Sequence, residues 1–405
     1  MPYDAVVDKA RLEGAMTATA DAIRAKTGSS ETLEWNPDTG FQAAVASITT
    51  GTKPVSEKEV NFFDYDGTLL HSYTVEEAKL LTALPPLPER EGLVCQGWNW
   101  TLDEVKSVDR PALIGANYDT PDGSTKLHID TVIDNLPVTL NLMQSAAHAV
   151  TVNWGDGSDL ETHGASGEFS LTHEYAIGGK YEITLASAEK TLTLGVVSTS
   201  AENTRIVCSP DVLLEANLGS NVSAVRGYTF YTLRTLRNVS FSAGIQFSDY
   251  SCFEALGSLL FLSLPKNAKS TGLYFCRYPG AMFGVSAPKN FSFGTTAFTD
   301  ASSLRYAAIP DGQSSVTSAC FRNARAMTRV YFPPSVTSIA GSAFSGCSSV
   351  LLYDFARHTD VPTLVNVNAF NDMNAACEIR VPAALYGQWV SAQNWATLAD
   401  HIVGV

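Results

Sequence analysis

The chain is short of charge for its length, and of positive charge most of all. Charged residues make up 17% of its 405 residues, against roughly 25% in an average globular protein. There are 27 Lys and Arg against 41 Asp and Glu, which gives a net charge of −14. Binding to a nucleic-acid backbone needs a basic face, so nucleic acid is not an expected partner.

Long apolar runs and cysteine motifs are also missing. No stretch approaches the ~18 consecutive apolar residues that suggest a membrane-spanning helix. Met1 to Ile23 contain no apolar core of a signal peptide, so we expect no ordinary secretion signal and no membrane insertion. The seven cysteines are scattered without a Cys-x-x-Cys pair, which favours buried free thiols over a disulfide scaffold or a zinc site.

Signatures of catalysis are equally scarce. The seven histidines form no i, i+4 pair and no His-Glu-x-x-His motif, and there is no Gly-rich phosphate loop. The acidic segment from Asn117 to Ser124 has oxygen ligands of the kind that Ca²⁺ takes, although an Asp-Gly hairpin turn accounts for the same residues. We therefore expect a protein that is not an enzyme, with no catalytic residue, cofactor or metal.

The strongest positive feature is an internal repeat over the second half of the chain. Phenylalanines recur at intervals of 23, 22, 23, 23, 23 and 26 residues, and a large apolar residue usually follows six positions later. These two columns are Phe230, Phe253, Phe275, Phe298, Phe321, Phe344 and Phe370, and Leu236, Leu259, Leu304, Met327 and Val350. The copy around Phe275 is the weakest, because Ala281 stands at its second position. One such unit cannot close a core, but stacked units bury both columns.

The best copy runs from Val330 to Cys347 and contains Pro333-Pro334-Ser335-Val336-Thr337-Ser338-Ile339 followed by Ala343-Phe344. It resembles the BspA-type leucine-rich repeat, and the resemblance covers roughly residues 220–385. The family usually has Gly where this chain has Ala340. The resemblance implies a solenoid that binds rather than catalyses.

Among the variable positions of the repeats, the exposed-looking residues are Tyr306, Arg322, Arg325, Arg329 and Tyr331. The residues Leu385, Trp389, Trp395 and Leu398 predict a helical cap at the end.

A second resemblance lies upstream, over about residues 110–190. The residues that carry it are Trp154, Gly155, Asp156, Gly157, His173, Tyr175 and Tyr181. The Trp-Gly-Asp-Gly-Ser segment, the later His-x-Tyr and the Gly-x-Tyr-x-Ile strand resemble a PKD-type immunoglobulin-like domain. This resemblance implies a β-sandwich that acts as a structural spacer.

The N-terminal residues predict a helix, since Leu12, Met16, Thr19 and Ile23 fall on one face. A stripe of this kind packs on another protein, on a neighbouring copy or back on its own chain. The order of the modules resembles that of uncharacterised virion or tail proteins from phages of gut Firmicutes. That resemblance implies a virion location, with other virion proteins held by the helix and a host cell-surface glycan or protein bound by the repeats.

One motif suggests a different class of protein. Val60-Asn61-Phe62-Phe63-Asp64-Tyr65-Asp66-Gly67-Thr68 resembles the first motif of the haloacid-dehalogenase phosphatases. In that family the first Asp attacks phosphorus, the second acts as general acid/base, and both help to place Mg²⁺. The remaining motifs of that family are missing from this chain. A β-hairpin with an Asp-Gly turn explains the same residues.

The sequence therefore predicts a mainly β, multi-domain chain. Its expected parts are a helical assembly or anchor segment (1–52), a small β-rich module (55–108), a PKD-like sandwich (109–200) and a BspA-type solenoid with a helical cap (201–405). The expected function is that of a tail-fibre or receptor-binding virion protein, possessing no enzymatic activity. Alternatives are a capsid head-fibre or decoration protein, a bacterial surface adhesin, and a phosphatase using Asp64 and Asp66. The sequence does not decide the oligomeric state, and a homo-oligomer is one of the alternatives.

Overall fold

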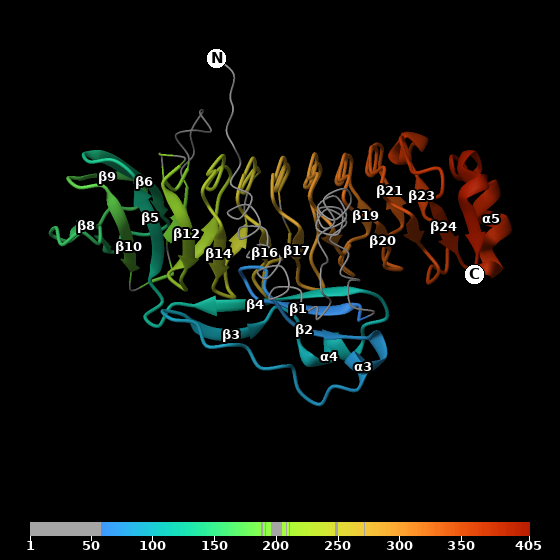
Figure 1. Cartoon of the computed structure of the whole chain (residues 1–405), viewed down its shortest axis with the longest axis horizontal. Helices are drawn as coiled ribbons and strands as arrows, with labels where there is room; N and C mark the ends of the chain where they lie inside the picture. The colour runs from blue at the N-terminus through green and yellow to red at the C-terminus, as the bar shows by residue number, and fades with distance from the viewer. Residues whose placement is uncertain are drawn as a thin grey trace, which may run out of the picture. The chain divides into compact units, whose positions relative to one another are not determined.

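The described part of the chain is built almost entirely of β-strands (Figure 1). The computed structural model describes residues 58–405, apart from residues 188, 191, 196–204, 208, 210, 248–249 and 271. The helical segment expected over residues 1–52 lies outside the described residues. Residues Val60–Val405 form one compact unit, within which no described helix is long and apolar enough to cross a membrane.

The first sheet of this unit belongs to the small β module, in the strand order β2-β1-β4-β3. Its strands are β1 (Val60–Phe63), β2 (Leu69–Tyr73), β3 (Val94–Trp98) and β4 (Ala112–Asp119). The expected hairpin is confirmed, since β1 and β2 pair antiparallel around a turn in which Gly67 has a φ of 86°. A φ in this region suits glycine because it has no Cβ.

Two short helices complete the module, α3 (Val75–Lys79) and α4 (Leu102–Lys106). Each begins with a capping box, in which a threonine and the glutamate three residues later satisfy each other's backbone N–H groups. The pairs are Thr74 with Glu77 and Thr101 with Glu104. Each helix buries a single side chain, so the caps supply much of what fixes these short helices in place.

The module extends further along the chain than expected. Strand β4 lies within the range 109–200 expected for the sandwich, but it pairs in parallel with β1 and antiparallel with β3. The chain leaves this sheet only at the turn of Asp122 and Gly123, after which β5 enters another sheet. The boundary at residue 108/109 therefore falls instead near residue 120.

Two larger sheets follow, with the orders β14-β12-β5-β10-β7-β8 and β15-β13-β11-β6-β9. Their strands are β5 (Thr125–Thr131), β6 (Leu136–Gln144), β7 (Val150–Asn153), β8 (Glu161–His163), β9 (Gly167–Tyr175), β10 (Gly179–Ser187), β11 (Leu192–Leu194), β12 (Leu213–Leu218), β13 (Val222–Val225), β14 (Asn238–Phe241) and β15 (Gln246–Phe247). Buried and half-buried side chains alternate along β5, as the period of a half-buried strand requires.

These sheets join the sandwich region to the repeats without a break. Strand β12 of the first repeat pairs antiparallel with β5, and β13 pairs in parallel with β11. The buried side chains from both regions belong to one continuous apolar core. Hydrogen bonding therefore crosses the expected boundary at residue 200/201.

The later repeats each add short parallel strands in two rows. One row holds β16 (Phe261–Ser263), β17 (Gly284–Ser286), β18 (Tyr306–Ala307), β20 (Arg329–Tyr331), β22 (Leu352–Asp354) and β24 (Glu378–Val381), and the other holds β19 (Ser315–Val316), β21 (Ser338–Ile339) and β23 (Thr363–Leu364). Partners in the register stand one repeat apart, as with Ser263 and Ser286. Parallel pairing between copies of one unit is what repeat architectures require.

The phenylalanine column is a stack of rings in the core. Ring centroids lie 4.9 Å apart for Phe230 and Phe253, and 5.5 Å apart for Phe321 and Phe344, with nearly parallel planes in both pairs. The apolar column six residues later is buried as well, at Leu236, Leu259, Leu304, Met327 and Val350. Each of these repeats thus contributes one phenylalanine and one large apolar side chain to a shared core.

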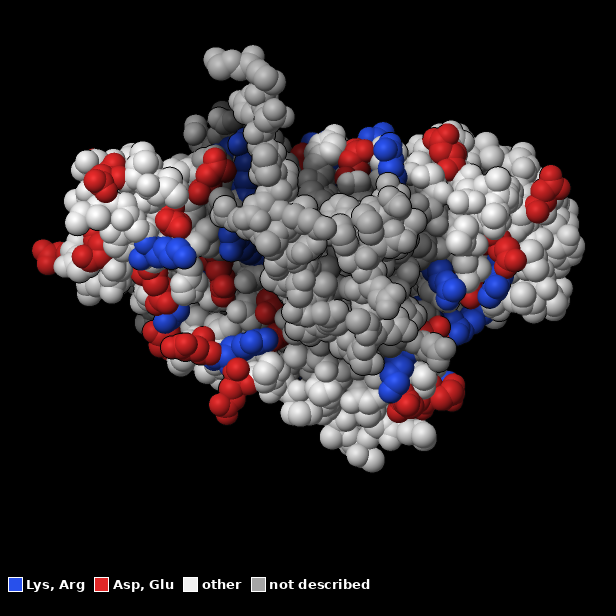
Figure 2. Space-filling view, in the orientation of Figure 1, with Lys and Arg blue, Asp and Glu red and all other residues white. Residues whose placement is uncertain are grey.

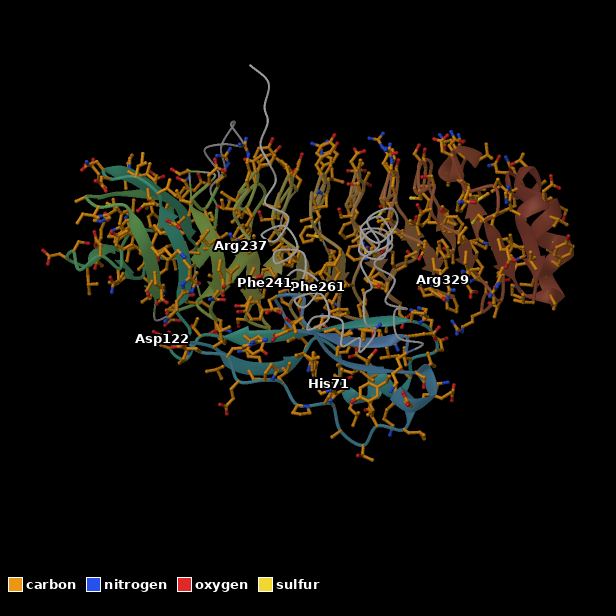
Figure 3. The ribbon with its side chains drawn as sticks, in the orientation of Figure 1. His71, Asp122, Arg237, Phe241, Phe261 and Arg329 are labelled. Atoms are coloured by element: carbon orange, nitrogen blue, oxygen red, sulfur yellow. The ribbon has the colours of Figure 1, made fainter. Side chains whose placement is uncertain are left out.

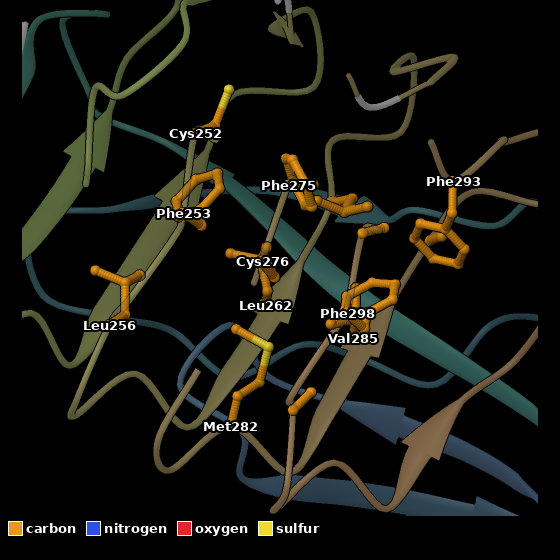
Figure 4. Close-up of a cluster of buried hydrophobic side chains, with 14 of the residues drawn as sticks. Cys252, Phe253, Leu256, Leu262, Phe275, Cys276, Met282, Val285, Phe293 and Phe298 are labelled. Atoms are coloured by element: carbon orange, nitrogen blue, oxygen red, sulfur yellow. The ribbon is translucent and has the colours of Figure 1, made fainter. Parts of the chain in front are cut away.

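The copy around Phe275 is shifted by one residue. The N–H of Phe230 donates to the carbonyl of Cys252, the residue before the next phenylalanine, but the N–H of Phe253 donates to Phe275 itself. Cys276 therefore holds the column position, and Phe275 occupies the place of the small residue. Met282 stands six residues after Cys276 and is fully buried (Figure 4). Met282, and not Ala281, therefore holds the second apolar position of this copy.

The chain ends in a small apolar cap. It consists of η2 (Val367–Phe370), η3 (Ala383–Leu385), α5 (Tyr386–Ser391), η4 (Trp395–His401) and β25 (Ile402–Gly404). Trp389 and Trp395 are buried, and their ring centroids lie 5.0 and 5.6 Å from that of Phe355. Leu385 and Leu398 pack partly buried against the same core, and the residues expected to form the cap lie in short helical segments separated by a break after Ser391.

Candidate functional site: the β-face of the repeats

The small β module packs directly on the row of strands that the repeats present. Phe63 and Leu113 form an apolar cluster with Phe261 of β16, and Phe283 and Tyr306 pack against this cluster. Figure 1 shows β4 running across β14, β16 and β17, and Figure 3 shows the Phe261 side chain. Strand β4 contacts all three of these strands. The outer surface of this row, which we call the β-face, is thus partly covered by the chain itself.

Buried hydrogen bonds fix the module on the β-face. The side-chain amide of Asn99 donates to the Ser286 hydroxyl at 2.9 Å, while its oxygen accepts from the N–H of Gly115, also at 2.9 Å. The Trp100 indole N–H donates to the carbonyl of Ala287 at 2.8 Å. Asn117 accepts from the backbone N–H of Lys266 at 2.8 Å. Because these polar groups are buried, separating the module would leave them without partners, at a cost of about 1–3 kcal/mol for each group not rehydrated.

Charged residues close the edge of this contact. Asp311 accepts from Arg110 and lies 3.2 Å from the Lys289 ammonium group. Arg357 of the repeats lies 3.4 Å from the carboxylate of Asp109. The Arg110 side chain is largely buried, and this burial lowers its pKa more than the neighbouring Asp109 raises it. A buried guanidinium that keeps two carboxylate partners is a fixed part of the structure.

Two outward-facing positions of each repeat form the β-face, eight and ten residues after the phenylalanine column. The first set is Asn238, Phe261, Gly284, Tyr306, Arg329, Leu352 and Glu378, and the second is Ser240, Ser263, Ser286, Ala308, Tyr331, Asp354 and Arg380. Under the module the second set is small, so the backbone of β4 can approach. Beyond the module it becomes large and polar.

The part of the β-face that no other described segment covers is the four-stranded sheet β20-β22-β24-β25. The register places Arg329 beside Leu352 and Glu378, and Tyr331 beside Asp354 and Arg380. Arg380 pairs with Glu378 at 3.1 Å, whereas no ion pair is found for Arg329 among the described residues. Figure 2, in the orientation of Figure 3, shows Lys and Arg next to Asp and Glu around the place where Figure 3 labels Arg329. We call the surface formed by Arg329, Tyr331, Leu352, Asp354, Glu378 and Arg380 the open β-face.

Comparison with known families assigns these repeats. The family model described as "BspA type Leucine rich repeat region" matches residues 211–280 and 277–386 in six copies. The repeat region carries BspA-type leucine-rich repeats.

Solved structures and curated proteins add little to this. A leucine-rich repeat protein from Bacteroides ovatus is 17% identical to this chain over 45% of its length, with a TM-score of 0.35. The matched part spans about half of that protein, 52% of its chain. The search of curated proteins gave no match.

The five residues of the BspA-type repeats that look exposed in the sequence lie in three different places. Arg329 and Tyr331 lie on the open β-face, but Tyr306 packs against the module. Arg322 and Arg325 are exposed in the turns that follow Phe321, away from the strands. Sequence reasoning did not select Asp354, Glu378 and Arg380. They recur at the spacing of the phenylalanine column, so counting eight and ten residues from each phenylalanine would have found them.

The Trp-Gly-Asp-Gly-Ser segment forms a compact polar cluster. Asp156 lies 2.7 Å from the Nε2 atom of His173, whose ring stacks on Trp154 with centroids 5.0 Å apart. The Tyr175 hydroxyl donates to the carbonyl of Trp154 at 2.8 Å. Gly155 and Gly157 have φ values of 83° and 87°, and Tyr181 stacks on Tyr175 with centroids 4.4 Å apart. All of the suggested residues therefore lie in or beside one cluster.

Asp156 is held ionised by its neighbours. Burial acts to raise its pKa, but hydrogen bonds from Ser158 and His173 outweigh this and lower the pKa from 3.8 to about 2. A carboxylate that accepts several hydrogen bonds behaves in this way without any metal. Among the described residues no group of three or more His, Cys, Asp and Glu could hold a metal ion.

The carboxylates of the two other acidic motifs also accept hydrogen bonds from residues of this chain. Asp64 is fully buried and accepts from the Arg90 guanidinium, with Arg90 Nε at 2.8 Å, and from the N–H of Tyr65. Asp66 lies 3.8 Å from Arg90 and accepts from the N–H of Thr68. In the segment 117–124, Asp122 accepts from both the N–H and the hydroxyl of Ser124. These contacts give each carboxylate a structural role.

Proposed function

We propose that this chain is a non-enzymatic recognition protein and that its BspA-type repeats bind a partner through the open β-face. The observation that carries this proposal is the change in the second outward set of positions. These are small serines where β4 covers the β-face and become Tyr331, Asp354 and Arg380 where it does not. Large polar side chains on exposed strands of a repeat array are typical of binding surfaces.

We further propose that the repeats form a solenoid, that the preceding strands form a PKD-like spacer, and that residues 1–52 anchor the chain to other virion proteins. The order of modules and the Trp154-Gly155-Asp156-Gly157 cluster support this. The partner is then a host cell-surface glycan or protein, and the chain is a tail-fibre or receptor-binding protein of a phage. The engagement of Asp64 by Arg90 favours this reading over a phosphatase.

The virion role is tested by immunogold labelling of purified particles with an antibody against residues 211–386, with a pull-down of the full chain on a panel of gut Firmicutes cells. We expect gold at the tail tip and binding to at least one strain. Gold on the head would contradict the tail-fibre role and identify a capsid head-fibre or decoration protein. Particles without any gold would contradict the virion role and leave the bacterial surface adhesin.

A further inference from the structure

A second surface of the repeats carries an unusual concentration of tyrosine. Five tyrosines lie in or next to the turns around the phenylalanine column of the first three repeats: Tyr228, Tyr231, Tyr250, Tyr274 and Tyr278. The Tyr228 ring centroid lies 5.3 Å from that of Tyr231 and 5.1 Å from that of Tyr250. Tyr250 and Tyr278 are 45% and 47% exposed. We call these five residues the tyrosine edge.

Three of these tyrosines occupy a backbone conformation that bulky residues avoid. Tyr228, Tyr274 and Tyr278 have φ values of 59°, 56° and 58°. The equivalent turn positions of the other repeats hold small or short polar residues: Ser251, Thr296, Ala319 and Ser342 before the column, and Thr232, Ala255, Asp300, Asn323, Gly346 and Asp372 after it. Positive φ disfavours a bulky side chain, and strain of this kind collects at functional sites. The backbone conformation therefore gives no reason for tyrosine at these three positions.

An ion pair lies next to the tyrosine edge, and the guanidinium of Arg205 lies 5.9 Å from the ring centroid of Tyr231. Glu254, which is only 3% exposed, pairs with the guanidinium of Arg277. That guanidinium also lies 4.5 Å from the ring centroid of Tyr274 and 5.0 Å from that of Tyr278. Contacts of a guanidinium with ring faces hold both partners in place. The edge thus combines fixed ring faces and phenol hydroxyls with a guanidinium whose charge is compensated.

We propose that the tyrosine edge is a binding site for a neutral saccharide. Tyrosine has an apolar ring face and a polar hydroxyl, so it can contact the C–H face of a sugar ring and hydrogen-bond to sugar hydroxyls. The compensated charge of Arg277 and the net charge of −14 disfavour polyanionic ligands. A proline-rich peptide also uses aromatic surfaces, but it does so in grooves, whereas these rings stand on a row of turns.

This site is separate from the open β-face. Its residues lie within three positions of the phenylalanine column, whereas the β-face begins eight positions after it. The tyrosine edge also belongs to the first three repeats, and the open β-face belongs to the last ones. The inference goes beyond the proposed function and does not depend on a virion location.

Affinity electrophoresis of the full chain tests the proposal, in gels containing dextran, mannan or β-glucan, with heparin as a polyanion and titration with a polyproline peptide. The test variant combines Tyr274→Ser, Tyr278→Asn and Tyr250→Ala, the first two of which restore the kinds of residue that other repeats use. Tyr386→Ala is the matched control, because Tyr386 is 42% exposed on α5. We expect retardation of the parent by at least one neutral polysaccharide and a loss of at least tenfold in affinity for the triple variant alone.

Stability separates a binding role from a structural one. Because two of the changes relieve left-handed strain, the Tm of the triple variant should equal or exceed that of the parent. A clear fall in Tm would overturn the proposal by showing that the tyrosines support the fold. Binding to heparin or polyproline alone, or to none of the probes, would overturn it too, as would equal retardation of the triple variant. None of these results would bear on cell binding through Arg329 and Tyr331.

Discussion

Gly115 of β4 faces Ser263 of β16 so closely that a Cβ atom on the glycine would overlap the serine hydroxyl. The same Cβ atom would also lie 3.0 Å from the Cβ of Ser286. The module and the repeats therefore meet backbone to side chain. Within the described part of the chain, this contact covers the N-terminal part of the β-face and not its C-terminal part.

The first prediction concerns this contact. Gly115→Ala should lower the free energy of unfolding by about 1–3 kcal/mol, the usual cost of overpacking. Combined with Ser263→Gly it should cost less than the sum of the two single changes, because the clash is removed. Urea denaturation measures both. The control is Gly164→Ala, where a Cβ atom meets nothing within 4 Å. A Gly115→Ala variant as stable as this control would contradict the close packing.

The second prediction concerns Asp64 and Arg90. Asp64→Asn should cost about 1.5–3 kcal/mol of stability, since it weakens hydrogen bonds to a buried charged group. Asp66→Asn should cost less, because Asp66 is partly exposed and lies 3.8 Å from Arg90. Urea denaturation is run beside hydrolysis of p-nitrophenyl phosphate with Mg²⁺. Mg²⁺-dependent hydrolysis that disappears in both variants would revive the phosphatase and contradict the account.

The third prediction is a pH dependence at Asp156. Its folded-state pKa is lowered to about 2, so the stability that it contributes is fully present above its ordinary value of 3.8. That contribution is lost as the pH falls from about 4 towards 2. Asp156→Asn should lower Tm at neutral pH and flatten the acid limb of the Tm profile in this window. Asp159→Asn, a change in the same exposed loop, is the control. Identical acid limbs in the parent and Asp156→Asn would refute the assignment.

The fourth prediction tests the one-residue shift at Cys276. Met282→Ala should cost about 2–5 kcal/mol, because Met282 is fully buried. Ala281→Leu should change stability by less than about 0.5 kcal/mol, because Ala281 is not part of the buried column. Thermal unfolding of the two variants distinguishes the registers. A gain in stability from Ala281→Leu would place Ala281, and not Met282, in the column.

Much of this fold could be predicted because the same residue pattern recurs in successive repeats. The phenylalanine column and the apolar column six residues later obey a spacing that stacked units explain, and Leu385, Trp389, Trp395 and Leu398 indicate a helical cap. The shift at Phe275 could not be predicted in the same way. Phe275 and Cys276 are both apolar and both buried, so only the backbone hydrogen bonds decide which of them holds the column position.

The packing of the module on the repeats could not be predicted from local patterns. Asn99 and Ser286 are 187 residues apart, and nothing in the sequence near either residue indicates the other. The same limit explains Tyr306, which looks exposed in the sequence but packs against the Phe63 cluster. Strand β4 was likewise assigned to the sandwich, because an apolar strand does not reveal which sheet it joins.

Recognition through the open β-face is tested by comparing two matched double variants in the pull-down on cells. Arg329→Ala with Tyr331→Ala alters the open β-face, and Arg322→Ala with Arg325→Ala alters exposed arginines of the same repeat that lie outside it. We expect the first variant to lose at least tenfold in binding to a strain that the parent binds, the second to retain this binding, and both to keep the parent Tm. Equal binding by the first variant and the parent would contradict recognition through the open β-face.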